Sequence, residues 1–161
     1  MIRIELSTFV AAPPERVFDL SRSIDLHLAS SARTGERAVA GRASGLLQVG
    51  ETVTWRARHL GVWQHLTTRL SAADRPRWFR DEMVRGAFRS FVHDHWFDAA
   101  DGGTLMRETF AFAAPLGPLG WIAERVLLRR YMTRFLVERN EEIRRAAEGE
   151  EWRRYLPADA G

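Results

Sequence analysis

Hydrophobic and polar residues alternate with a period of two along most of the segment from Glu36 to Ala113. Successive side chains of a β-strand point to opposite faces of the sheet, so this period predicts strands. The predicted strands are 36–41, 46–60, 63–73, 76–85, 89–98 and 104–113, separated by turn signals such as Gly61, Gly86 and Asp101-Gly102-Gly103. Connections this short join antiparallel neighbours, because parallel strands need long crossovers.

The segments on either side of this meander are expected to supply one further strand and three helices. Ile2 to Val10 alternates as a strand, Pro13-Pro14-Glu15 opens a short helix, and Ser23 caps a second helix from Ile24 to Ser30. A breaker segment with Pro115, Gly117 and Pro118 precedes a long helix, Leu119 to Ala147. Its apolar stripe recurs at helical spacing and consists of Trp121, Leu128, Tyr131, Phe135 and Ile143.

Length and composition indicate a single globular domain. A chain of 161 residues with 45% hydrophobic residues is long enough to bury a core. We expect residues 1–148 to form this domain and 149–161 to form a polar tail. The absence of Cys excludes disulfides, thiol nucleophiles and thiolate metal sites. No signal peptide or apolar run of membrane-spanning length is visible, so we expect a cytoplasmic location.

The distribution of charge argues against nucleic acid as a partner. All 24 basic residues are Arg, the net charge is only +3, and the Arg residues are interleaved with Asp and Glu instead of forming one patch. The absence of Lys also excludes Schiff-base chemistry and a phosphate-binding P-loop. The oligomeric state does not follow from the sequence.

Three neighbouring strands carry ionisable residues on faces that are otherwise apolar. Asp81 lies between Phe79 and Met83, and Glu108 lies between Met106 and Phe110. His93 and His95 share a face with Phe91 and Phe97. A ligand pocket has an apolar wall with a few placed polar groups, so this pattern predicts the lining of a cavity.

The order of elements and several local motifs resemble a known superfamily. The motifs are Phe9 to Phe18 (FVAAPPERVF), Val49 to Arg56 (VGETVTWR), Asp81 to Phe88 (DEMVRGAF), His93-Asp94-His95 and Gly102 to Met106 (GGTLM). They are similar to the helix-grip superfamily of START lipid-transfer domains, the birch pollen allergen and the polyketide cyclases/dehydratases, also called SRPBCC. The resemblance implies an α+β fold, with a curved antiparallel sheet around the long C-terminal helix and two short helices after the first strand.

The same resemblance implies an apolar cavity between the sheet and the long helix. We expect it to be lined by Trp55, His59, Phe79, Asp81, Met83, Phe91, His93, His95, Glu108 and Phe110. The leading hypothesis is binding of a small hydrophobic molecule such as a lipid, isoprenoid or polyketide-like compound. One alternative is an aromatase/cyclase or dehydratase that uses His and carboxylate acid–base chemistry. Another is a chaperone-like module that binds a protein segment; the sequence does not decide whether a reaction is catalysed.

Two further interpretations of the ionisable residues stay open at this point. His93 and His95 could bind a metal together with Asp81 or Glu108, since two imidazoles on one strand face can reach one ion. Asp81 and Glu108 could instead act as an acid–base pair, or each could pair with a His or with Arg80, Arg85 or Arg107. We expect no metal and no other cofactor, and the sequence does not identify a catalytic residue.

Overall fold

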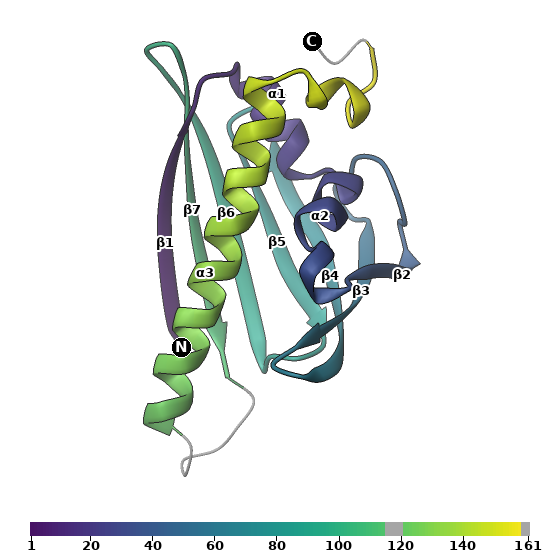
Figure 1. Ribbon diagram of the computed structural model, residues 1–161, viewed down its shortest axis with the longest axis vertical. Coiled ribbons are helices and arrows are strands. Elements are labelled where there is room, and N and C mark those ends of the chain that lie inside the picture. Colours follow the sequence, from purple (N-terminus) through teal and green to yellow (C-terminus); the bar gives the residue numbers. More distant parts are fainter. Residues whose placement is uncertain (115–120, 159–161) are drawn as a thin grey trace.

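The computed structural model describes residues 1–114 and 121–158, and it contains one curved, fully antiparallel sheet (Figure 1). The strand order is β1-β7-β6-β5-β4-β3-β2. The strands are β1 (Ile2–Val10), β2 (Arg37–Gly41), β3 (Thr52–His59), β4 (Val62–Asp74), β5 (Trp78–Arg85), β6 (Ser90–Ala100) and β7 (Gly103–Ala113).

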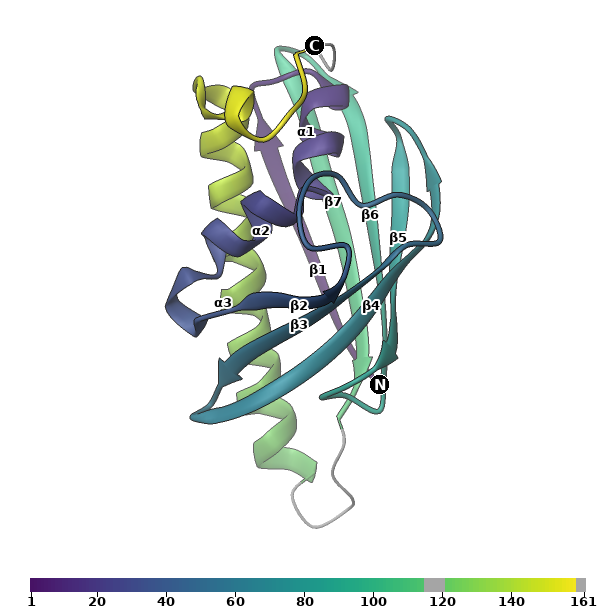
Figure 2. The same cartoon turned by 90° about the vertical axis from the view of Figure 1, so that its right-hand side faces the viewer.

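The long helix α3 (Trp121–Glu148) lies across the concave face of the sheet (Figures 1 and 2). Two short helices, α1 (Pro14–Ser21) and α2 (Ile24–Ser30), connect β1 to β2 and cover the same face. Short 3₁₀ turns follow at Ala32–Thr34 and Glu151–Arg154. This architecture confirms the predicted helix-grip fold.

Local sequence signals place the two short helices and the last hairpin. Pro14 occupies the first turn of α1, where its missing N–H needs no partner, and the Ser23 hydroxyl accepts a hydrogen bond from the Leu26 N–H at the start of α2. Gly102 has φ 78° in the turn between β6 and β7. A Cβ on Gly103 would lie 2.2 Å from the carbonyl oxygen of Val10, so the β1–β7 contact requires glycine there.

One predicted strand boundary is wrong. The segment 46–60 was expected to be a single strand, but β3 begins only at Thr52. Gly45 and Gly50 have φ of 76° and 87°, and the Arg22 guanidinium donates a hydrogen bond to the Leu47 carbonyl oxygen. The loop therefore packs against the short helices instead of joining the sheet. The other strands differ from their predicted bounds by at most two residues.

Several predictions fall on residues outside the described part of the chain. These are the helix start at Leu119 and the breakers Pro115, Gly117 and Pro118. The side chain of Trp121, the first member of the predicted stripe, also lies outside the description.

The space between α3 and the sheet is filled at one end. There, Phe18 of α1 packs edge-on against Phe79 and Phe97, with ring centroids 5.4 and 5.3 Å away. The last turns of α3 close this cluster through Ile143, Ala146 and Ala147, and Leu156 of the C-terminal segment is buried in it too. On α3, Leu128, Phe135 and Arg139 face a different region, which this core does not fill.

Candidate ligand-binding cavity

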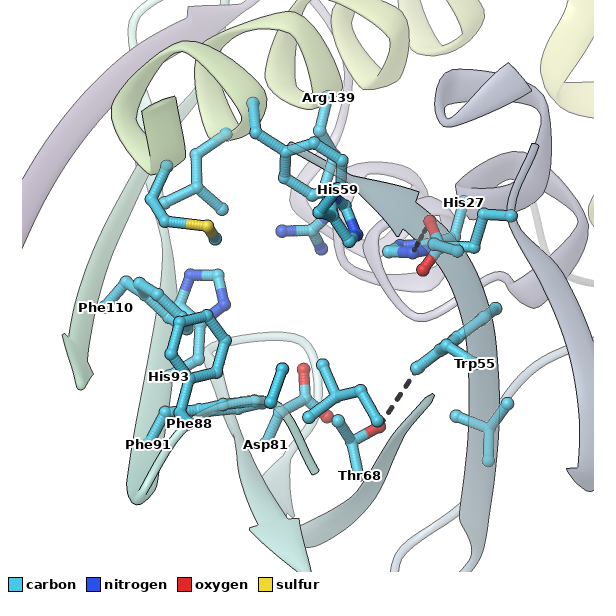
Figure 3. Close-up of a pocket in the computed structure, with 18 of the residues that line it drawn as sticks. His27, Trp55, His59, Thr68, Asp81, Phe88, Phe91, His93, Phe110 and Arg139 are labelled. Carbon is cyan, nitrogen blue, oxygen red and sulfur yellow. Dashed lines mark hydrogen bonds and ion pairs between the residues drawn. The ribbon is translucent and has the colours of Figure 1, made fainter. Parts of the chain in front are cut away.

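A cavity of about 340 Å³ lies between the concave face of the sheet, α2 and α3 (Figure 3). Pockets for small molecules typically measure roughly 300–1,000 Å³, so this volume suits a ligand of modest size. Its apolar wall is formed mainly by Phe88, Phe91 and Phe110 from the sheet side and by Leu128, Met132 and Phe135 from α3.

Six of the ten predicted lining residues border this cavity. They come from β3, β5, β6 and β7 and are Trp55, His59, Asp81, Phe91, His93 and Phe110. Figure 3 shows the side chains of all six around the same open space. Contact of these residues with a ligand stays a prediction.

The other four predicted residues, Phe79, Met83, His95 and Glu108, do not border the cavity. Phe79 is completely buried, stacked on the His95 ring at 4.2 Å and covered by Phe18 of α1. Met83 packs with the aromatic cluster at the other end of the sheet, and Glu108 lies behind His93. The period-two pattern identified the correct face of each strand, but α1 covers part of that face.

Several lining residues were missed by the sequence analysis. His27 belongs to α2, Glu36 immediately precedes β2, and Thr68 lies on β4. Arg139 comes from α3, four residues after Phe135, so it extends the apolar stripe with a charged residue. This helical spacing was the one sequence signal that could have identified Arg139 as a lining residue, because a charged side chain at a core-facing helical position is uncommon.

Glu108 is the centre of a buried polar network beside the cavity. Its Oε2 accepts a hydrogen bond from His93 Nε2 at 2.9 Å, and its Oε1 accepts one from the Asn140 side-chain amide. The Arg139 guanidinium lies 3.6 Å from the same Oε2. Burial alone would raise the pKa of Glu108, but the hydrogen bond from His93 and the charges of His93 and Arg139 outweigh it and lower the pKa to about 2. Glu108 is therefore ionised at neutral pH.

This network determines which nitrogen of His93 carries the proton. An ionised carboxylate can only accept hydrogen bonds, so Nε2 of His93 must be the donor. In the neutral imidazole, Nδ1 is then the basic nitrogen. His93 is a wall residue of the cavity, held from behind by Glu108.

Asp81 is the carboxyl group directly on the cavity wall beside His93, its cross-strand neighbour. Its Oδ2 lies 3.5 Å from Nε2 of His95, and it makes no hydrogen bond to any residue that the structure describes. Burial raises the pKa of the Asp81 carboxyl despite the opposing charges of His93 and Arg139. Burial also lowers the pKa of His95 well below its usual value, so His95 is neutral.

The sheet arginines considered as partners for these carboxylates bind elsewhere. Arg80 forms an ion pair with Asp94, and Arg107 forms one with Asp98. Arg85 donates a hydrogen bond to the Thr67 hydroxyl. The arginine that lies beside Glu108 is instead Arg139 of α3.

A second polar group lies on the α2 side of the cavity. Nε2 of His27 lies 3.2 Å from Glu36 Oε2, and the His27 ring contacts Trp55 with centroids 4.3 Å apart and ring planes tilted by 33°. The Trp55 indole N–H donates to the Thr68 hydroxyl, and Nδ1 of His59 lies 2.7 Å from the Tyr131 hydroxyl. Burial would raise the pKa of Glu36, but His27 outweighs it, so the pKa is lowered and Glu36 is ionised. Burial lowers the pKa of His59.

Asp81, His93 and His95 are also the group best placed to hold a metal ion among the described residues. One ligand atom from each lies within 4.8 Å of the others. A carboxylate and two imidazoles suit Zn²⁺ or Fe²⁺. However, the Arg139 guanidinium acts on Asp81, His95 and Glu108, and its positive charge opposes a dication there.

Comparison with protein families gives one match that spans most of the chain. The family model described as "Polyketide cyclase / dehydrase and lipid transport" matches residues 1–148. No curated protein sequence matches the chain significantly.

Solved structures share the fold at low sequence identity. TTHA0849 from Thermus thermophilus superposes with a TM-score of 0.73 at 16% identity, covering 89% of this chain and 94% of the other. A START superfamily protein from Mycobacterium smegmatis gives 0.68 at 10% identity, covering 91% and 97%. Ara h 8.0201 gives 0.60 at 15% identity, covering 88% and 97%. At these identities the similarity establishes the fold alone.

Within the described residues, α3 is the longest helix, and neither it nor any other helix is apolar enough over a sufficient length to cross a membrane.

Proposed function

Because the chain belongs to the family described as polyketide cyclase / dehydrase and lipid transport, we propose that its cavity binds a small hydrophobic molecule. The observation that supports this most directly is the composition of the cavity wall. Aromatic and aliphatic side chains of the sheet and α3 face an unfilled space of about 340 Å³. Several polar side chains on the wall are already paired with one another, namely His27 with Glu36, Trp55 with Thr68 and His59 with Tyr131.

Titration with N-phenyl-1-naphthylamine, an uncharged apolar fluorophore, tests the proposal. We expect saturable fluorescence enhancement at one site per chain. Phe91→Trp or Phe110→Trp should weaken binding on the order of tenfold, because the larger indole occupies part of the cavity. Phe9→Trp is a matched control, since Phe9 is 45% exposed on β1 and does not border the cavity.

Circular dichroism of all three variants would show whether the fold is retained. Equal binding by the wild type, the cavity variants and the Phe9 variant would place the fluorophore outside the cavity and contradict the proposal. Native mass spectrometry of the freshly purified protein would identify a molecule that co-purifies.

A second candidate function is acid–base catalysis of the cyclase or dehydratase type. His93, oriented by the ionised Glu108, can accept a proton on Nδ1, and Asp81 on the same wall has a pKa raised by burial. A base beside a carboxyl group whose pKa is raised is the pair of groups that proton abstraction next to a ketone and loss of a hydroxyl group require.

Exchange of the α-protons of 1-phenyl-1,3-butanedione for deuterium, followed by NMR, tests this second function. Wild-type protein should accelerate the exchange above the buffer rate, and His93→Gln should abolish the acceleration while N-phenyl-1-naphthylamine still binds. An exchange rate equal to that of buffer, with the diketone shown to bind, would leave binding as the function.

A further inference from the structure

The charges around the cavity constrain what kind of hydrophobic molecule it accepts. Among the described lining residues, two Arg side chains, Arg22 and Arg139, supply permanent positive charge. Arg22 is committed to other groups, because its Nε and Nη2 donate to Asp19 and its Nη1 donates to the Leu47 carbonyl oxygen. Arg139 is the second lining guanidinium, and it reaches the cavity from α3.

Arg139 is itself close to negative charge. Its Nη2 donates to the carbonyl oxygen of Ser21 at 3.1 Å, and its Nη1 lies 3.6 Å from the ionised Glu108. Glu36 adds a second ionised carboxylate on the opposite side of the cavity. The two carboxylates Glu36 and Glu108 therefore accompany the one guanidinium of Arg139 around the cavity.

Asp81 would add to the cost of an anionic ligand. Its carboxyl group points into the cavity in Figure 3. The side chain is 22% exposed, and none of the described residues donates a hydrogen bond to it. A ligand carboxylate or phosphate placed there would be repelled by the negative charge of Asp81 whenever this carboxyl group is ionised. A ligand hydroxyl, in contrast, can donate to Asp81.

From this arrangement we propose that the natural ligand is an uncharged apolar molecule bearing a hydroxyl group, which donates a hydrogen bond to Asp81. A primary amine would also pair with Asp81, but its positive charge would be opposed by Arg139, whose charge acts on the same carboxyl group. A fatty acid or lipid phosphate is disfavoured by Asp81, Glu36 and Glu108. The inference rests on the proposed binding function and specifies its ligand class.

Competition against bound N-phenyl-1-naphthylamine at pH 8 tests the inference with three ligands of equal chain length. 1-Decanol is uncharged, decanoate is negative and decylamine is positive under these conditions. We expect 1-decanol to displace the fluorophore at concentrations at least about tenfold lower than decanoate or decylamine. One satisfied hydrogen bond in a buried site changes the affinity by a factor of this size.

Two variants identify Asp81 as the origin of this preference. Asp81→Leu removes the acceptor and the charge, so 1-decanol should bind about three- to tenfold more weakly and decanoate more tightly. Asp81→Asn keeps the shape of the side chain and should strengthen decanoate binding without the same loss for 1-decanol. Asp98→Asn is the control, because Asp98 is 51% exposed and pairs with Arg107 away from the cavity.

The outcomes separate this inference from the proposed function. If wild-type protein fails to bind the fluorophore at all, the binding function itself is wrong. If the fluorophore binds but decanoate or decylamine competes as well as 1-decanol, the ligand class is wrong and the binding function stands. An unchanged ratio of 1-decanol to decanoate affinity in both Asp81 variants would also overturn the inference.

Discussion

Replacement of Glu108 by Gln should destabilise the protein in a pH-dependent way. The pKa of Glu108 is about 2 in the folded chain, against 4.5 for an unperturbed Glu. Each pKa unit corresponds to about 1.36 kcal/mol, so the ionised carboxylate stabilises the fold at pH 7 by about 3 kcal/mol. Because the folded pKa is depressed, this contribution is complete above pH 4.5 and is lost as the pH falls towards 2.

Urea denaturation followed by tryptophan fluorescence at pH 7 and pH 3 measures this contribution. Gln mimics the protonated carboxyl group, so Glu108→Gln should unfold with about 3 kcal/mol less free energy than wild type at pH 7. At pH 3 the difference in unfolding free energy should narrow to about half of its value at pH 7, because much of the wild-type contribution is already lost.

Glu5→Gln provides the matched control for this experiment. Glu5 lies on strand β1 with its side chain 67% exposed, and its ion pair with Arg3 is a surface pair of the kind that contributes at most about 1 kcal/mol. A Glu108→Gln protein as stable as wild type at pH 7, or a stability difference that does not change between pH 7 and pH 3, would refute the buried network around Glu108.

Two further predictions concern the core residue Phe79 and the group of Asp81, His93 and His95 that could hold a metal ion. Phe79→Ala should lower the free energy of unfolding by about 3–5 kcal/mol, because Phe79 is fully buried against Phe18 and Phe97. It does not border the cavity, so fluorophore affinity of the folded protein should change less than about twofold, and a loss comparable to that of Phe110→Trp would contradict this assignment. Chelation with EDTA should leave the thermal midpoint unchanged, because Arg139 opposes a dication beside Asp81 and His95; stoichiometric zinc or iron by elemental analysis, lost together with stability, would be the contrary result.

Local patterns in the sequence were sufficient to predict the helices, the antiparallel strands and most of the strand bounds, whereas the curved sheet around the long helix followed from the resemblance to the helix-grip superfamily. Alternation with period two depends only on the geometry of an extended chain, and short connections force antiparallel neighbours. The same alternation identified the inward face of β5, β6 and β7, so Asp81, His93 and Glu108 were correctly assigned to one side of the sheet. The failure at 46–51 came from a loop whose backbone bonds to the connection between α1 and α2, where the Leu47 N–H donates to the Arg22 carbonyl oxygen.

The position of the cavity on that face was decided only by tertiary structure. Strand periodicity does not specify where along the strand another element packs, and α1 fills the end of the sheet at which Phe79 and His95 lie. The charge environment depended on the tertiary structure as well, because Arg139 and Asn140 reach Glu108 from a helix about thirty residues further along the chain. Spatial contacts between residues that are distant in sequence determine burial and pKa, and hence which carboxyl group is available to a ligand.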